Sequence, residues 1–205
     1  MSDGYLRIRV TIGGDTLLTH NGQMIDPLNP YVKALKALTS DRALKKTDEG
    51  VAAIARAEYE AGLYLDTKKR AILPSRVLEA HIAEAARKTK EGKIALAGMF
   101  VDTDGVLEYD GGPMTVAQLL DSPAHRLTVN AKVQQASVMR TRPLFTNWRT
   151  TFQVSVLAEM VSPDALRTWL QNGGNFVGLG DWRPRYGRYE VRAFEILSAK
   201  KLKAA

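Results

Sequence analysis

The fold is decided first by the stretch LRIRVTIGG at residues 6–14. Its apolar residues alternate with polar ones from Leu6 to Ile12. Because successive side chains of a β-strand point to opposite faces of a sheet, this pattern predicts a strand with one buried face. Glycine pairs favour turns, so we expect the strand to end at Gly13.

After this strand, the sequence predicts several helices first and further strands later along the chain. A polar, glycine- and proline-containing loop follows, and then helices at 31–38 and 48–63. Apolar residues at helical spacing predict another helix, with Ser75 as its N-cap, which ends near residue 90. The compact apolar run at 94–101 predicts a buried strand.

The second half of the sequence predicts further strands. Residues 106–109 suggest a short strand before a glycine-proline turn. Alternating patterns at 128–139 and 150–157 predict two strands that pair antiparallel through residues 140–149. Ser162 and Pro163 open a helix that Gly173 and Gly174 end, and a last strand begins at Tyr189, before a basic tail.

These elements predict one α+β domain over residues 1–205. We assign 15–73 to a loop and helical insertion and 94–127 to a smaller insertion. The remaining order is strand, helix, strand, strand, helix, strand, the βαββαβ order of a modified ferredoxin-like (RRM-like) sheet. Two helices would cover one face of the sheet and leave the other face for a ligand.

Composition excludes several classes of protein. The chain has 205 residues, of which 45% are apolar and 25% charged, as in ordinary globular domains. It has no cysteine, which excludes disulfides, cysteine-based zinc sites and cysteine nucleophiles. No apolar run approaches the ~20 residues of a membrane span, and no secretory signal is visible. We expect a soluble cytoplasmic protein that needs no cofactor or metal.

The positive charge is unevenly distributed. The net charge is +7, and between Arg140 and Arg192 every basic residue is an arginine. The planar guanidinium suits phosphate contacts and base stacking, which favours nucleic acid as a partner.

The segment 173–189 combines glycines, aromatic residues and arginines. A phosphate loop of the Rossmann or Walker type precedes a helix, whereas this segment follows one, so that interpretation fails. Its glycines allow close approach of a ligand, its aromatic rings offer stacking faces, and its arginines offer phosphate contacts. The residues are Gly178, Gly180, Trp182, Arg183, Arg185, Tyr186, Gly187 and Arg188. The alternative is a tight connection with a solvated arginine face and a core tryptophan.

Residues 139–149 repeat this composition with Arg140, Arg142 and Arg149. They form a candidate second part of the same groove. The alternative is a hairpin loop whose Phe145 and Trp148 fold back on the core.

Candidates for catalysis are weak. His20 and Asp26 lie in the loop after the first strand, where a histidine could transfer protons and a carboxylate could bind a metal. Such loops commonly hold aspartate for turn geometry, and the three histidines form no ligand motif. We therefore favour a protein that is not an enzyme and assign no catalytic residue beyond these two candidates.

Three stretches resemble the RAMP superfamily, the repeat-associated RNA-binding proteins of CRISPR systems, and in particular their backbone subunits. They are residues 6–14 with the GQMIDP loop at 22–27, the stretch AILPSRVLEA at 71–80, and the glycine-rich loop and strand at 176–191. The resemblance implies a modified ferredoxin-like domain that binds single-stranded RNA, often as side-by-side subunits. It also implies that Asp26 matches an aspartate with which some members cleave RNA. A stand-alone relative from a virus or mobile element, in the host cytoplasm, fits as well.

Three functions follow as hypotheses. The first is binding of single-stranded RNA or DNA by a homo-oligomer or a subunit of a nucleoprotein complex. The second is a metal-dependent or histidine-assisted ribonuclease that uses Asp26 or His20. The third is a structural protein of a viral particle or another large assembly.

Overall fold

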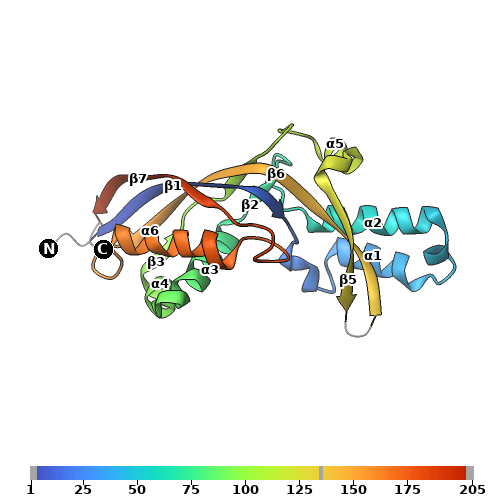
Figure 1. The fold of residues 1–205 in the computed structure, drawn as a ribbon, viewed down its shortest axis with the longest axis horizontal. Coiled ribbons are helices and arrows are strands. Elements are labelled where there is room, and N and C mark those ends of the chain that lie inside the picture. The colour runs from blue at the N-terminus through green and yellow to red at the C-terminus, as the bar shows by residue number, and fades with distance from the viewer. Residues whose placement is uncertain (1–3, 134–135, 202–205) are drawn as a thin grey trace.

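The computed structural model describes residues 4–133 and 136–201, which form an α+β structure around an antiparallel sheet (Figure 1). The described part has seven strands, in the order β2-β4-β6-β1-β7, with β3 and β5 also paired to β6. The strands are β1 (Gly4–Leu18), β2 (Ile72–Leu73), β3 (Met99–Val101), β4 (Gly105–Glu108), β5 (Arg126–Val133), β6 (Ala136–Leu157) and β7 (Glu190–Lys201).

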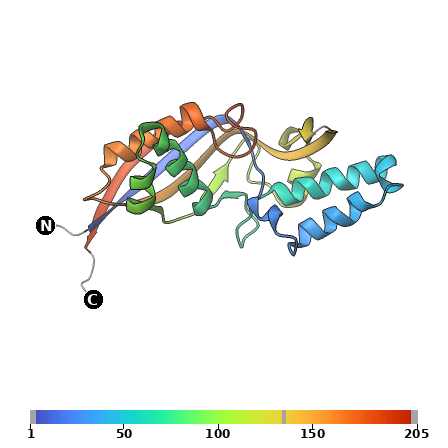
Figure 2. The ribbon, with the colours of Figure 1, turned by 90° about the horizontal axis from the view of Figure 1, so that it is seen from below.

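Six α-helices accompany the sheet in the described residues. They are α1 (Pro30–Ser40), α2 (Asp48–Gly62), α3 (Ser75–Ala86), α4 (Gly92–Gly98), α5 (Val116–Asp121) and α6 (Pro163–Asn172). Helices α3 and α6 lie together against one face of the sheet, whereas α1 and α2 project side by side at one end, next to the β5–β6 hairpin (Figure 1 and Figure 2). The helices predicted at 31–38 and 48–63 are thus confirmed.

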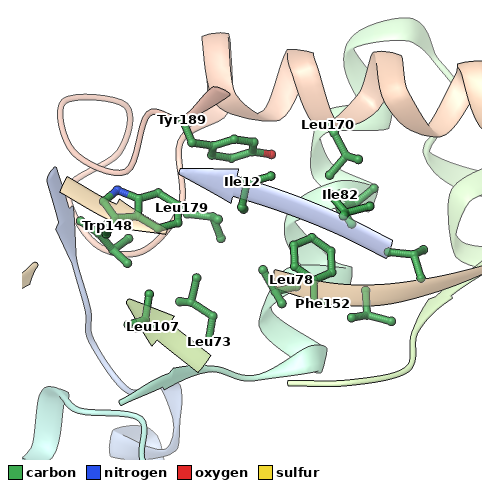
Figure 3. Close-up of a cluster of buried hydrophobic side chains, with 14 of the residues drawn as sticks. Ile12, Leu73, Leu78, Ile82, Leu107, Trp148, Phe152, Leu170, Leu179 and Tyr189 are labelled. Atoms are coloured by element: carbon green, nitrogen blue, oxygen red, sulfur yellow. The ribbon is translucent and has the colours of Figure 1, made fainter. Parts of the chain in front are cut away.

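The core lies between the sheet and the α3–α6 layer (Figure 3). Ile8, Val10 and Ile12 of β1 are at most 1% exposed, as their alternation predicts. Burying each such side chain contributes about 1.5–3 kcal/mol. The intervening residues face away from the helices and are polar: Thr11 and Thr151, for example, are hydrogen-bonded at 2.9 Å. At this position the open face of the sheet therefore offers no ring on which a base could stack.

The prediction that the first strand ends at Gly13 is wrong, because β1 continues to Leu18. A Cβ atom on Gly13 would lie 2.8 Å from the carbonyl oxygen of Trp148, and one on Gly14 would lie 2.0 Å from that of Arg188. The two glycines therefore allow neighbouring backbones to pass closely, and they do not turn the chain.

The prediction of a strand at 94–101 is wrong over most of its length. Residues 92–98 form α4, and only 99–101 extend as β3. Short apolar runs do not distinguish a buried strand from a buried helix. At the end of α4, a Cβ atom on Gly98 would lie 2.8 Å from the Val161 side chain. The helix therefore packs too closely at this position for a residue larger than glycine.

Two helix ends differ in detail from the expectation. Ser75 is the first residue of α3 and not its cap, which is Pro74. The backbone N–H of Ser75 instead donates to the Asp104 carboxylate at 2.7 Å. At α6 the Ser162 cap is confirmed, since its hydroxyl accepts from the Ala165 N–H at 3.1 Å. The chain continues past Gly173 as a π-helical turn to Val177.

Residues 140–149 do not form the expected connection between two strands. They are the middle of β6, a strand of 22 residues. Its first part pairs with β5, from Arg126 opposite Pro143 onwards, and its second part pairs with β1. Residues 134–135, between the two strands of this hairpin, lie outside the described residues. Residues 94–127, expected as a small insertion, include β3 and β4, which pair with β6.

Candidate nucleic-acid interface

The glycine-rich segment is held against the end of β1 by backbone hydrogen bonds. The Asp181 N–H donates to the Leu18 carbonyl at 2.8 Å, and the Gly187 N–H donates to the Thr16 carbonyl at 2.8 Å. A third bond, from the Leu179 N–H to the Gly187 carbonyl at 2.8 Å, closes the segment on itself. We call residues 178–188 the glycine-rich turn, and its backbone position is set by β1.

Glycine is required at two points of this turn. Gly180 and Gly187 have φ values of +80° and +77°, in the left-handed region that favours glycine. A Cβ atom would lie 2.0 Å from the Leu18 carbonyl oxygen at Gly180 and 1.7 Å from the Leu179 carbonyl oxygen at Gly187. Gly178 shares the positive φ. These glycines thus shape the turn itself, before any ligand is considered.

Trp182 also adopts a left-handed conformation, with a φ of +50°. For a bulky residue this conformation is strained, and such strain is concentrated at functional sites. The Asp181 carboxylate holds it by accepting the Trp182 N–H at 3.0 Å, and the Trp182 carbonyl accepts from the Tyr186 N–H at 3.2 Å. The two rings lie with their centroids 6.3 Å apart, and each remains partly exposed.

The glycine-rich turn faces the β5–β6 hairpin across a cleft of about 430 Å³. Residues 129–131 of β5 line one side, and Trp182, Arg185 and Tyr186 line the other. The Arg185 guanidinium lies 6.0 Å from the centroid of the Tyr186 ring. We call this space the hairpin cleft; it brings two aromatic rings and a cation to one opening.

Three of the predicted arginines are paired with carboxylates. Arg142, only 12% exposed at its side chain, donates to Asp181 at 2.8 Å. Arg183 donates to Glu84 of α3 at 2.8 Å. Arg140 pairs with Glu58 of α2, which also accepts the Thr141 N–H at 2.8 Å. These arginines join elements of the fold.

The remaining three arginines are more accessible. Arg149 is 61% exposed and lies 3.9 Å from Glu108 on the neighbouring strand β4. Within residues 4–133 and 136–201, Arg185 and Arg188 have no carboxylate partner, and the Arg188 Nε donates to the Pro184 carbonyl at 3.0 Å. Arg185 and Arg188 are therefore the cations of the turn that are available to a ligand.

The aromatic residues of β6 do not belong to the interface. Phe145 and Trp148 are buried, at 0% and 1% exposure, and Trp148 lies in the core shown in Figure 3. The alternative interpretation thus holds for these two side chains. Sequence reasoning missed Glu58 and residues 129–131 as members of this interface, because their proximity to the arginines depends on the hairpin.

The two weak catalytic candidates occupy different settings. One oxygen of the exposed Asp26 carboxylate accepts the Leu28 N–H at 2.8 Å, the local bond of a turn-forming aspartate. His20 follows β1 and is exposed; partial desolvation together with the Arg142 charge lowers the pKa of its imidazole, while the Asp181 charge acts in the opposite direction. The charges of Arg142 and Asp181 thus both act on the His20 imidazole.

Among the described residues, no group of three or more histidines and carboxylates is placed to hold a metal ion. Nor does any helix within 4–133 and 136–201 have the length and apolarity to cross a membrane. No protein-family model matches the chain, and no curated protein matches its sequence.

Proposed function

We propose that this protein binds single-stranded RNA or DNA in the hairpin cleft. The observation that carries the proposal is the placement of Trp182 and Tyr186 opposite β5, with Arg185 at the same opening. Base–aromatic stacking contributes about 1–3 kcal/mol per base, and arginine beside an aromatic ring contacts both base and phosphate. Arg188, on the same turn, is a second exposed cation without a carboxylate partner in the described residues, and it lines a neighbouring pocket with residues 13–15.

The rigidity of the turn supports this assignment. The hydrogen bonds to Thr16 and Leu18 fix the backbone, and Asp181 fixes the strained Trp182. A stacking platform that is already ordered loses little conformational entropy on binding. The paired arginines Arg140 and Arg142 would then not contact the ligand. Through their ion pairs they would support the turn and the hairpin.

We also propose that the architecture is a modified ferredoxin-like fold of the RAMP kind. In support, α3 follows β1, α6 connects β6 to β7, and β1 lies between β6 and β7. The second strand of the βαββαβ order would be β3 with β4, and the β5–β6 hairpin would be an extension of the sheet. Subunits of such a protein would assemble side by side along a bound strand.

Fluorescence anisotropy with labelled oligonucleotides tests the proposed function. We expect single-stranded RNA or DNA to bind at low salt more tightly than a duplex of the same length. Log K should fall with log[salt] by roughly 0.7 per phosphate contact. The double variant Arg185→Gln with Arg188→Gln should weaken binding, whereas Arg42→Gln, which removes an exposed arginine before α2, should not. Absence of binding, or binding insensitive to salt, would contradict the proposal.

A further inference from the structure

A second cleft, of about 500 Å³, shares Trp182 with the hairpin cleft. Glu84 of α3 and Lys88, in the short turn after α3, line it together with residues 180–184 of the glycine-rich turn. Phe176, from the π-helical turn that follows α6, also lines it. We call this space the α3 cleft. Of the described residues, only Trp182 lines both spaces, so the two clefts adjoin at this residue.

Phe176 is the exposed aromatic residue that the α3 cleft adds. It is 63% exposed, whereas the backbone that carries it is closely packed. A Cβ atom on Gly174 would lie 2.0 Å from the Tyr189 carbonyl oxygen, and the Gly178 N–H donates to the Gly173 carbonyl at 2.8 Å. Turns of π-helix are frequent at functional sites. The ring is therefore open to a ligand on a backbone that is already ordered, which lowers the entropy cost of binding.

The cations of the α3 cleft differ in their availability. Arg183 donates to Glu84 at 2.8 Å, and Asp181 is paired with Arg142, so these charges are matched within the fold. Lys88 is exposed and has no carboxylate partner in the described part of the chain. Its positive charge remains unmatched at this opening, and a phosphate of a nucleic acid would neutralise it.

We infer that the α3 cleft holds the continuation of a single strand bound in the hairpin cleft, with a base stacked on Phe176 and a phosphate beside Lys88. This inference rests on the proposed function and adds a path to it, because the strand would cross the glycine-rich turn at Trp182. The observation that carries it is that two clefts with aromatic linings adjoin at one aromatic residue. In single-strand grooves, successive bases stack on aromatic side chains while cations follow the backbone.

Anisotropy titrations with oligothymidylate or oligouridylate, whichever the unchanged chain binds more tightly, test the stacking role of Phe176. Phe176→Ala should weaken binding by about tenfold, the loss of one base stack, whereas Phe176→Trp should bind at least as tightly as the unchanged chain. Phe100→Ala is the matched control, because Phe100 of β3 is 40% exposed and lines neither cleft. Equal affinity of Phe176→Ala and Phe100→Ala would overturn the inference.

Salt dependence tests the role of Lys88. Lys88→Gln should reduce the slope of log K against log[salt] by roughly 0.7, the loss of one phosphate contact to a single strand. Lys33→Gln, which removes an exposed lysine of α1, should leave the slope unchanged. The same slope in both variants would overturn the placement of a phosphate beside Lys88.

Strand length separates this inference from the proposed function. Single-strand-binding domains cover roughly 4–16 nucleotides, so Phe176→Ala should lose more affinity for strands of about ten nucleotides than for the shortest strands that bind. Trp182→Ala should weaken binding at every length, because this residue lines both clefts. If Trp182→Ala weakens binding and Phe176→Ala does not, the proposed function stands and the path through the α3 cleft is wrong. If no strand binds the unchanged chain, the proposed function fails and the inference fails with it.

Discussion

Arg142 of β6 donates through its Nε to Oδ2 of Asp181 at 2.8 Å, and this ion pair joins the longest strand to the glycine-rich turn. The two side chains are only 12% and 24% exposed. The other carboxylate oxygen of Asp181 accepts the Trp182 N–H. One aspartate therefore connects an arginine from β6 to the strained residue of the proposed stacking platform.

Replacement of Arg142 should destabilise the fold. In Arg142→Gln the Asp181 carboxylate keeps its charge and loses its partner in a largely shielded position. We expect a loss of about 1–3 kcal/mol in the free energy of unfolding, measured by urea denaturation. The double variant with Asp181→Asn should lose less than the sum of the two single variants. Strict additivity would show that the pair contributes no coupling energy.

A methyl group at position 187 should be poorly tolerated. Gly187→Ala combines a φ of +77° with a Cβ atom 1.7 Å from the Leu179 carbonyl oxygen. We expect a loss of at least about 2 kcal/mol in unfolding free energy. Gly22→Ala is the matched control, because its nearest contact would lie at 3.8 Å. Similar stability of the two variants would mean that the turn does not depend on its glycine.

Trp182→Ala should lower affinity for single-stranded oligonucleotides by about tenfold or more, the free energy of one lost base stack. The measurement is anisotropy at fixed salt. Tyr31→Ala removes another exposed aromatic ring, 42% exposed at the first turn of α1, and should leave affinity unchanged. Equal affinity of both variants would place base stacking elsewhere in the protein.

Stability should fall at mildly acidic pH because of His81. Its imidazole is 4% exposed, its Nε2 lies 2.9 Å from the Tyr189 hydroxyl, and burial lowers its pKa from 6.5 to about 4. Between these two values the unfolded chain binds a proton that the folded protein does not. The unfolding free energy therefore decreases as pH falls from 6.5 towards 4, by up to about 3 kcal/mol.

Denaturation at pH 7 and pH 4.5 measures this effect. His81→Gln, which keeps a side chain able to hydrogen-bond Tyr189, should show a flatter pH dependence than the unchanged chain. His20 contributes in the same direction, since its pKa is also lowered. An equal slope in both proteins would show that His81 does not control the acid response.

Local sequence patterns predicted the structure correctly where a residue's neighbours in sequence are also its neighbours in space. The alternation from Leu6 to Ile12 predicted a strand with one buried face, and Ser162 predicted the start of α6. The same reasoning was misled at Gly13 and at 94–101. There the structure depends on close approach to Trp148 and Val161, which are distant in sequence.

For the candidate site, the sequence determined which types of residue are present, namely aromatic residues, arginines and glycines in residues 178–188. Only the tertiary structure decided which arginines remain available. Arg140, Arg142 and Arg183 find carboxylates on α2, the glycine-rich turn and α3, so Arg185 and Arg188 remain unpaired within the described residues. The physical reason is that an ion pair depends on distances of a few ångströms across the fold, and composition carries no information about those distances.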